Sequence, residues 1–163
     1  MTVSCDRLEL LAVSADMTIY VTPSPRDFEA DVLEALEFYG VEACTVAPEG
    51  IEAGTIRVSR TGGHLYMESE RDRAEGLIEV WGATSVHAFD LAIRPWAVIR
   101  SRTDARFLVP GVPVHDVTID PPRAMDDPHR PHLYRVQFAF QMTIPLADYR
   151  LDPEEASWPT DTP

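Results

Sequence analysis

Three places in the sequence combine residue types that could do chemistry. The first is residues 57–83, "RVSRTGGHLYMESERDRAEGLIEVWGA", where two adjacent glycines precede a histidine, a tyrosine and interleaved acids and arginines. The second is residues 126–132, "DDPHRPH", whose carboxylates and imidazoles are metal-ligand types. The third is Cys44, a thiol inside an apolar run. Each of these places also has a plainer structural interpretation, which the surrounding pattern favours.

The glycine pair does not match a nucleotide-binding motif. The stretch lacks the G-x-x-x-x-G-K-[ST] pattern of a phosphate loop, and the chain contains no lysine to contact the phosphates. A dinucleotide fingerprint has three spaced glycines, whereas Gly62 and Gly63 are adjacent. We therefore predict that the pair lies where one strand bends to reach the next, and we expect no cofactor.

The other two places favour structural roles as well. The proline-rich loop 120–132 holds four side chains that could reach one metal ion: Asp126, Asp127, His129 and His132. Neighbouring prolines and the lack of a second cluster favour a solvated loop over a metal site. Cys44 with a distant histidine stays open as a nucleophile, although its place in a strand pattern favours burial. No G-x-S-x-G elbow occurs, so the sequence predicts no catalytic residue and no metal site.

Charge and composition narrow the classes of partner. The formal net charge is −13, and every basic side chain other than histidine is an arginine. Binding to a nucleic-acid backbone depends on lysines and arginines that release counterions, so such binding is not expected. No apolar run is long enough to cross a membrane, and the N-terminus does not resemble a signal peptide. We expect synthesis in the cytoplasm, with Cys5 and Cys44 reduced.

Hydrophobic periodicity predicts the order of the elements. One helix is expected from Phe28 to the glycine cap at Gly40. A second helix is expected from Ser85, after the capping residue Thr84, with Pro95 kinking it or ending its regular part. Alternating runs bounded by turn residues predict strands at 41–47, 54–60, 75–83, 112–119 and 133–146. This order predicts an α+β domain, with a mostly antiparallel sheet and two helices packed on one face.

Two apolar faces are expected to form the core. The last strand alternates, and its apolar face comprises Tyr134, Val136, Phe138, Phe140, Met142 and Ile144. The spacing in the second helix predicts burial of Val86, Phe89, Ala92, Ile93 and Trp96. The main domain is expected to span residues 24–147.

The two ends of the chain differ in composition. Residues 1–23 hold two short apolar runs and are expected to form a folded N-terminal extension, either a hairpin or an extended arm. Residues 148–163 are acidic and rich in proline. They are expected to form a C-terminal arm that is mobile in the free subunit and fixed where Trp158 finds a pocket on an adjacent protein.

Six short motifs occur in a fixed order between residues 26 and 146: "RTGG" (60–63), "DRA" (72–74), "IEVWG" (78–82), "AFDLA" (88–92), "DPP" (120–122) and "YRVQF" (134–138). In this order they resemble the tail terminator, or tail completion, proteins of long-tailed bacteriophages, particularly those that infect actinobacteria. The sequence departs from the family pattern in two ways. The first 23 residues have no counterpart, and Gly82 stands where an alanine is customary.

The resemblance implies a structural virion protein rather than an enzyme. It implies a homo-oligomeric ring, a hexamer, at the head-tail junction, made in the host cytoplasm. The ring would cap the tail tube protein, end tube polymerisation and join the tail to the head connector, and DNA would only pass through its lumen. The residues expected at interfaces are Arg60, Gly62, Gly63, His64, Arg71, Arg73 and Trp158.

Two other interpretations stay open at the level of sequence. One is a neighbouring neck or head-closure protein of the same junction. The other is a small α+β enzyme or ligand-binding domain. Particle mass separates these classes, since a ring subunit assembles and a small enzyme or binding domain of this size can act as a monomer.

Overall fold

The computed structural model describes residues 11–12, 18–46 and 50–151. The elements, in chain order, are β1 (Leu11–Ala12), β2 (Thr18–Ser24), α1 (Phe28–Phe38), β3 (Ile56–Tyr66), a 3-10 turn (Met67–Ser69), β4 (Arg71–Gly82), α2 (Ser85–Ala105), β5 (His115–Ile119), β6 (Arg123–Met125), β7 (Tyr134–Pro145) and β8 (Ala147–Leu151). The fold is α+β and all pairs of named strands are antiparallel, as the sequence predicts.

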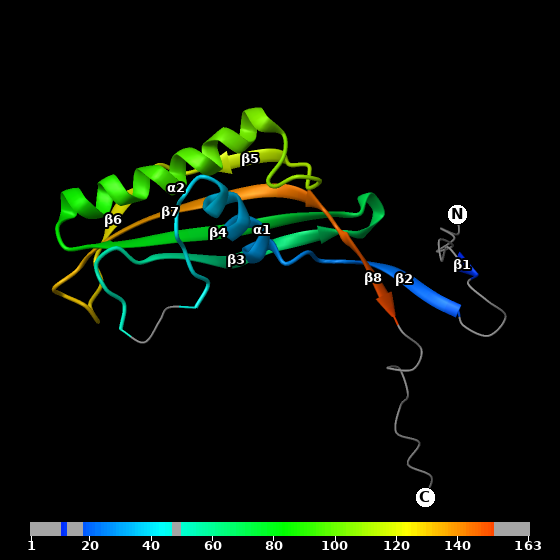
Figure 1. Cartoon of the computed structure of the whole chain (residues 1–163), viewed down its shortest axis with the longest axis horizontal. Helices are drawn as coiled ribbons and strands as arrows, with labels where there is room; N and C mark the ends of the chain where they lie inside the picture. The colour runs from blue at the N-terminus through cyan, green and yellow to red at the C-terminus, as the bar shows by residue number, and fades with distance from the viewer. Residues whose placement is uncertain (1–10, 13–17, 47–49, 152–163) are drawn as a thin grey trace, which may run out of the picture.

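The main sheet has the strand order β3-β4-β7-β5, and the short strand β6 also pairs with β7. β4 and β7 are aligned over their whole length, from Arg71 opposite Pro145 to Gly82 opposite Tyr134. Both helices pack on one face of this sheet, and Figure 1 shows α2 running along it beside α1. Their shared core contains Val32 and Leu36 from α1, and Ile78 and Phe138 from the sheet. The opposite face of the sheet carries no helix in the described part of the chain, and it is called the open face below.

The start of each helix follows from its capping residue. Asp27 accepts a hydrogen bond from the backbone N–H of Ala30 at 3.0 Å, which begins α1. The Thr84 hydroxyl accepts one from the N–H of His87 at 3.1 Å and begins α2 in the same way. Pro95 does not end α2, which continues without a break to Ala105.

The face that α2 buries matches the predicted one only at Ala92. The buried stripe consists of small or compact side chains: Ala88, Ala92, Pro95, Val98 and Ile99. Of the residues expected to be buried, Val86, Phe89 and Ile93 are exposed and Trp96 is half-buried. The alanines lie on the inner face because their small side chains let the helix axis come close to β4. A Cβ atom at Gly82 would lie 2.4 Å from the backbone nitrogen of Ala88.

The glycine pair lies inside a strand and not in the bend. β3 continues through Gly62 and Gly63 as far as Tyr66, and the bend is the 3-10 turn that ends at Glu70 with φ 51°. The prediction was wrong because the glycines lie at a β-bulge. The register of β3 shifts between Arg60 and Gly62, and the next residue, Gly63, adopts a φ of 135°. The hairpin is therefore longer than expected.

Two further strand predictions were wrong. Of the predicted strand 41–47, the structure describes residues 41–46, and these contribute one isolated bridge, from Cys44 to Arg57. β6 forms inside the stretch that was expected to be loop, because β7 is long enough to pair with it after β5 ends. β7 itself matches the prediction closely, and its inward side chains from Val136 to Ile144 are buried. Tyr134, at its start, is 53% exposed because the sheet extends beyond the core there.

β2 and β8 form a two-stranded antiparallel ribbon with β1 beside β2. Leu11 lies opposite Ile19, so the N-terminal runs form a hairpin, one of the two expected arrangements. Residues 148–151, the first part of the predicted C-terminal arm, lie in β8 and pair with β2. Figure 1 shows the ribbon leaving the main sheet at the end where the β3–β4 turn lies. Trp158 lies outside the described residues.

Candidate functional site

Arg60, at the base of the extended hairpin, makes its hydrogen bonds within the subunit. Arg60 makes a bidentate ion pair with Asp72 across β3 and β4, with nitrogen-to-oxygen distances of 2.7 and 2.8 Å. The Asp72 carboxylate is fully buried, and the backbone N–H of Arg60 donates to Glu29 of α1 at 2.7 Å. Both the backbone and the guanidinium of Arg60 are thus held within the subunit, and its expected contact with a partner stays a prediction.

The glycines of the same motif are structural too. A side chain at Gly63 would meet the Arg73 carbonyl oxygen at 2.4 Å, so the close approach of the two strands excludes one. Gly62 is half-buried beside the Glu75 carboxylate. The two glycines shape the bulge, which lets the hairpin extend beyond the core.

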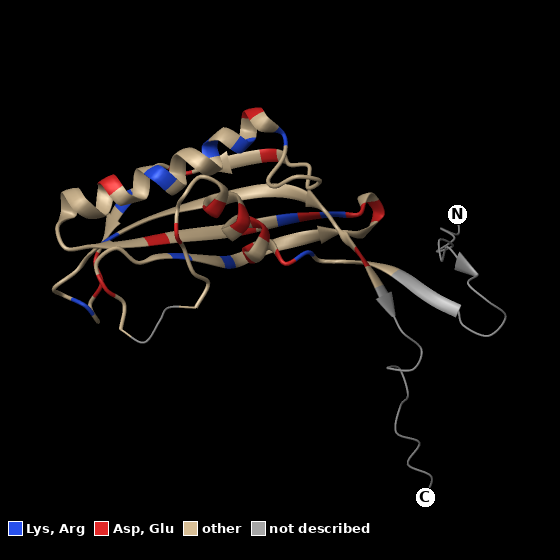
Figure 2. Ribbon diagram, viewed as in Figure 1, with Lys and Arg blue, Asp and Glu red and all other residues tan. Residues whose placement is uncertain are grey.

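Four exposed side chains at the end of the hairpin gather on the open face, and we call them the hairpin patch: His64, Tyr66, Arg71 and Arg73. His64 lies opposite Arg73, and Tyr66 lies opposite Arg71, so all four point to the same side. The rings of His64 and Tyr66 meet edge to face at 4.7 Å between centroids. Figure 2 shows arginines and acids interleaved along β4 behind the turn.

The arginines of the hairpin patch have no acidic partner among the described residues. Arg73 donates to the neutral Gln141 side chain at 2.7 Å, and Gln141 donates to Glu75 at 2.9 Å. Arg71 makes no side-chain hydrogen bond within the described chain. The sequence analysis named His64, Arg71 and Arg73 as expected interface residues but not Tyr66. Its position two residues after His64 in an extended strand places it on the same side, and this spacing could have identified it.

At the other end of β4, the open face holds a buried ionic cluster. Glu79 accepts hydrogen bonds from both Arg57, at 2.8 Å from its Nε, and Arg135, at 3.3 Å. The Arg57 guanidinium lies over the Trp81 ring, 5.7 Å from its centroid. These contacts join β3, β4 and β7 across the open face, while the Arg135 Nε is buried without a hydrogen-bond partner among the described residues.

Asp127 anchors the proline-rich loop to this cluster. Its carboxylate accepts from the Trp81 indole N–H at 2.9 Å and from the His129 backbone N–H at 3.1 Å. The indole hydrogen bond is the main cause that lowers the pKa of Asp127 below its ordinary value, while burial acts in the opposite direction. The neighbouring arginines Arg130 and Arg135 lower the pKa further.

The proline-rich loop is only partly as expected. Asp126, His129 and His132 are exposed, as predicted for a solvated loop, but Asp127 is buried because it binds Trp81. No group of three or more metal-ligating side chains comes together in the part of the chain that the structure describes. Cys44 is half-buried, and its thiol donates to the Ile56 carbonyl oxygen at 3.5 Å.

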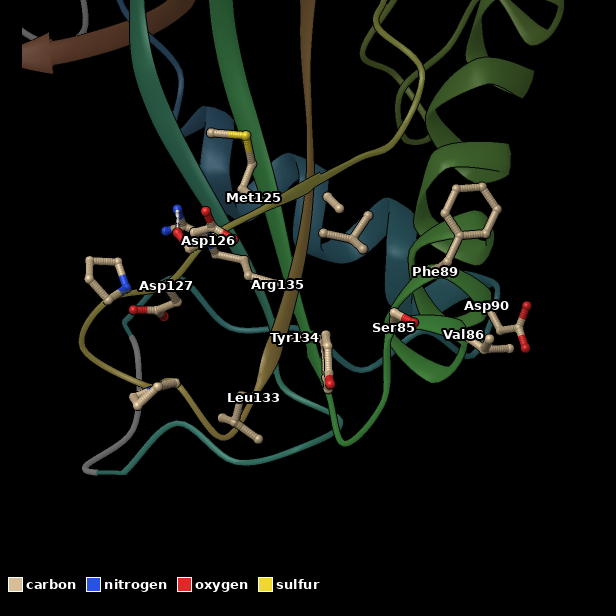
Figure 3. Close-up of a pocket in the computed structure, with 14 residues that line it drawn as sticks. Ser85, Val86, Phe89, Asp90, Met125, Asp126, Asp127, Leu133, Tyr134 and Arg135 are labelled. Carbon is tan, nitrogen blue, oxygen red and sulfur yellow. Dashed lines mark hydrogen bonds between the residues drawn. The ribbon is translucent and has the colours of Figure 1, made fainter.

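A groove of about 970 Å³ lies beside the start of α2. We call it the terminal groove. Its exposed apolar side chains are Val86 and Phe89 from α2, Met125 from β6 and Tyr134 from β7. Figure 3 shows these residues in two walls, with the first turns of α2 on one side and the 125–134 segment on the other.

The terminal groove also carries exposed acids. Asp90 lies one residue after Phe89, and Asp126 follows Met125. Neither carboxylate makes a hydrogen bond or ion pair within the described residues; only the backbone carbonyl of Asp126 accepts one, from Arg135 at 2.9 Å. The i, i+3, i+7 spacing of Val86, Phe89 and Ile93, beside the alanine stripe, was the signal that could have identified this surface.

A smaller hollow of about 320 Å³ lies where α1 ends against the C-terminal end of α2. Phe38, Tyr39 and Phe107 are exposed around it. Arg102 crosses the gap, since its guanidinium donates to the Tyr39 hydroxyl at 2.7 Å and lies 5.1 Å from the Tyr39 ring centroid. The described surface therefore has several separate apolar areas rather than one enclosed cavity.

Comparison with known proteins adds no family assignment. No protein-family model matches the chain, and no curated protein matches it. Among the described residues, no helix is both long enough and apolar enough to cross a membrane.

Proposed function

We propose that this protein is a ring-forming structural subunit of a bacteriophage tail, which caps the tail tube, ends its polymerisation and joins the tail to the head connector. The order of six motifs in the sequence suggests this role. The fold is compatible with it, since an α+β body with an extended hairpin and a projecting ribbon has the surfaces that a ring subunit needs.

The observation that carries the proposal is the β2–β8 ribbon. Its strands pair chiefly with each other and with β1, away from the helix-covered core. A ribbon of two strands beside a third strand, β1, of only two residues is at best marginally stable by itself in water, because it buries little apolar surface. Residues 22–24 are half-buried and Tyr149 is half exposed, so the ribbon is suited to pack on a further surface. A neighbouring protein in an assembly supplies that surface.

The exposed apolar side chains support the same conclusion. Val86 on α2 is 68% exposed and Phe38 on α1 is 79% exposed, although both are large and apolar. Several such areas on one small protein are typical of a subunit that contacts more than one neighbour. A tail-capping ring subunit has at least three kinds of neighbour, namely other copies, the tube and the connector.

The test is assembly on the tube. We expect the purified protein, mixed with the tail tube protein of its own virus, to form particles with a mass of about six subunits on the tube ends, and to shorten tubes that otherwise grow without limit. Light scattering measures the mass, and electron microscopy measures tube length. A ring that binds the head side and leaves tube length unchanged would indicate a neck protein instead. A protein that stays monomeric with the tube protein present would contradict the proposed function.

A further inference from the structure

We propose that the hairpin patch of one copy docks into the terminal groove of the next copy, which makes a head-to-tail contact. The inference rests on the proposed function, because it requires several copies to assemble. It assigns both surfaces of the subunit interface, and it identifies the ligand of the groove as a second copy of this chain.

The two surfaces match in chemistry. The hairpin patch presents two arginines without acidic partners among the described residues, together with the rings of His64 and Tyr66. The terminal groove presents Asp90 and Asp126, whose carboxylates are equally unpaired in the described chain, beside an exposed apolar floor. Arginine forms bidentate hydrogen bonds with carboxylates and stacks on aromatic rings, so the arginines of the patch suit both the acids and the tyrosine of the groove.

The two surfaces cannot meet within one subunit. β4 carries the hairpin patch at its first residue and leads into the terminal groove at its last. It has 12 residues, so its ends lie about 35 Å apart at ~3.3 Å per residue. Figure 1 shows the β3–β4 turn at one end of the sheet and the start of α2, with β6, at the other. A contact between them has to join two copies.

The geometry of such a contact leads to an assembly rather than a dimer. Each copy uses one surface as donor and a different surface as acceptor, so both remain available at the ends of any chain of copies. A head-to-tail contact of this kind closes into a ring when its rotation permits. The 970 Å³ groove is larger than a single aromatic side chain, so it has room for Tyr66 and a neighbouring arginine together.

Charge reversal on each side tests the contact. The patch variant carries Arg71→Glu and Arg73→Glu, and the groove variant carries Asp90→Arg and Asp126→Arg. All four positions are exposed, so both variants should fold, and circular dichroism melting checks this. The control for the patch variant, Arg94→Glu with Arg100→Glu, makes the same change in net charge as that variant, on exposed α2 residues away from the groove.

We expect each variant alone to assemble on tube ends only at a concentration at least about tenfold higher than the parent needs, since like charges then face each other. The control should assemble as the parent does. An equimolar mixture of the two variants should recover ring mass, because every contact in it joins either two native surfaces or two reversed ones. Assembly of the patch variant at the parental concentration would overturn the inference, and so would a mixture of folded variants that fails to recover.

A crosslink decides the matter if a reversed variant does not fold. In a Cys5→Ser, Cys44→Ser background, copies with Arg71→Cys are mixed with copies with Asp90→Cys under mild oxidation. We expect disulfide-linked dimers that contain one copy of each kind, and far fewer from either copy alone. Rings that form without mixed crosslinks overturn this contact but leave the proposed function intact. Failure of the parent protein to assemble with its tube protein overturns both.

Discussion

The two faces of the main sheet are stabilised in different ways, although they share every strand. On the helix-covered face, side chains such as Val58, Ile78 and Phe138 are fully buried, and the Arg60–Asp72 pair is the ionic exception. On the open face, the Trp81 ring and the Glu79 carboxylate are buried by loops and arginines instead of by a helix. The first face depends on packing, and the second depends on directed polar contacts.

The difference explains how one sheet serves both fold and assembly. Apolar burial is proportional to area and does not depend on direction, so it suits the face that has to hold two helices. Directed ion pairs keep the opposite face polar where no helix covers it, and they leave the end of the hairpin free for a partner. Variants that weaken one face without the other test this division.

The largest expected effect comes from the packed face. Phe138→Ala should lower the free energy of unfolding by about 3–5 kcal/mol, because it removes a fully buried ring from between the helices and the sheet. Tyr134→Ala, on the same side of the same strand but 53% exposed, should cost under about 1 kcal/mol. Urea unfolding measures both. Equal losses for the two variants would show that the burial gradient along β7 is not as described.

The second effect tests why Gly82 replaces the alanine customary in the family that the chain resembles. Gly82→Ala should destabilise the protein by about 1–3 kcal/mol, since the added carbon meets the Ala88 backbone nitrogen at 2.4 Å. Gly62→Ala is the matched control, because its new carbon meets only the movable end of the Glu75 side chain, at 3.0 Å. Thermal melting compares the two. A Gly82 variant as stable as the parent would mean that α2 shifts freely on the sheet.

β7 and α2 show how much of the fold could be predicted from the sequence. β7 could be predicted because its strict alternation leaves only one apolar side. The start of α2 could be predicted too, but most of its buried face could not. Its apolar spacing pointed to Val86, Phe89 and Ala92, whereas close approach to β4 favours Ala88 and Ala92 on the inner face. Helix periodicity reports which residues share a side, and it does not report how near the neighbouring backbone lies.

The candidate interface shows the same limit. The resemblance predicts Arg60, His64, Arg71 and Arg73 at an interface, and the last three are exposed. The pairing of Arg60 with a buried Asp72 depends on the bulge, which shifts the register of β3 against β4 by one residue. No local signal in the sequence specifies that shift, so the sequence could not show that an internal ion pair holds Arg60.

The third effect concerns the ion pair between Arg60 and Asp72 on the helix-covered face. Asp72→Ala should cost about 1–3 kcal/mol, because Arg60 then keeps its charge beside the Phe28 ring without the Asp72 carboxylate that it binds. Glu75→Ala removes an exposed carboxylate three positions later in β4 and should cost a few tenths of a kcal/mol at most. Chemical denaturation distinguishes them. A loss at Asp72 no larger than that at Glu75 would indicate that Arg60 is well solvated in the folded subunit.

The smallest expected effect is a pH dependence on the open face. Hydrogen bonds from Trp81 and from the His129 backbone, together with nearby arginines, hold the pKa of Asp127 below its ordinary value in the folded protein. The unfolded chain therefore takes up the proton at a higher pH than the folded protein does. The contribution of Asp127 is fully present above the ordinary pKa of an aspartic acid, and it is lost as the pH falls through the lower value of the folded state.

Asp127→Asn isolates this contribution, since the amide keeps an oxygen that can accept from the Trp81 indole but does not titrate. We expect the melting temperature of the parent to fall more steeply between neutral and acidic pH than that of the Asn variant. Asp126→Asn, next to it but exposed and without a side-chain hydrogen bond in the described chain, should follow the parent at every pH. The difference between the curves of the parent and of Asp127→Asn reports the contribution of Asp127. Parallel curves for the parent and Asp127→Asn would show that the indole contact does not favour the charged carboxylate, and the open face would then owe its stability to the Glu79 cluster.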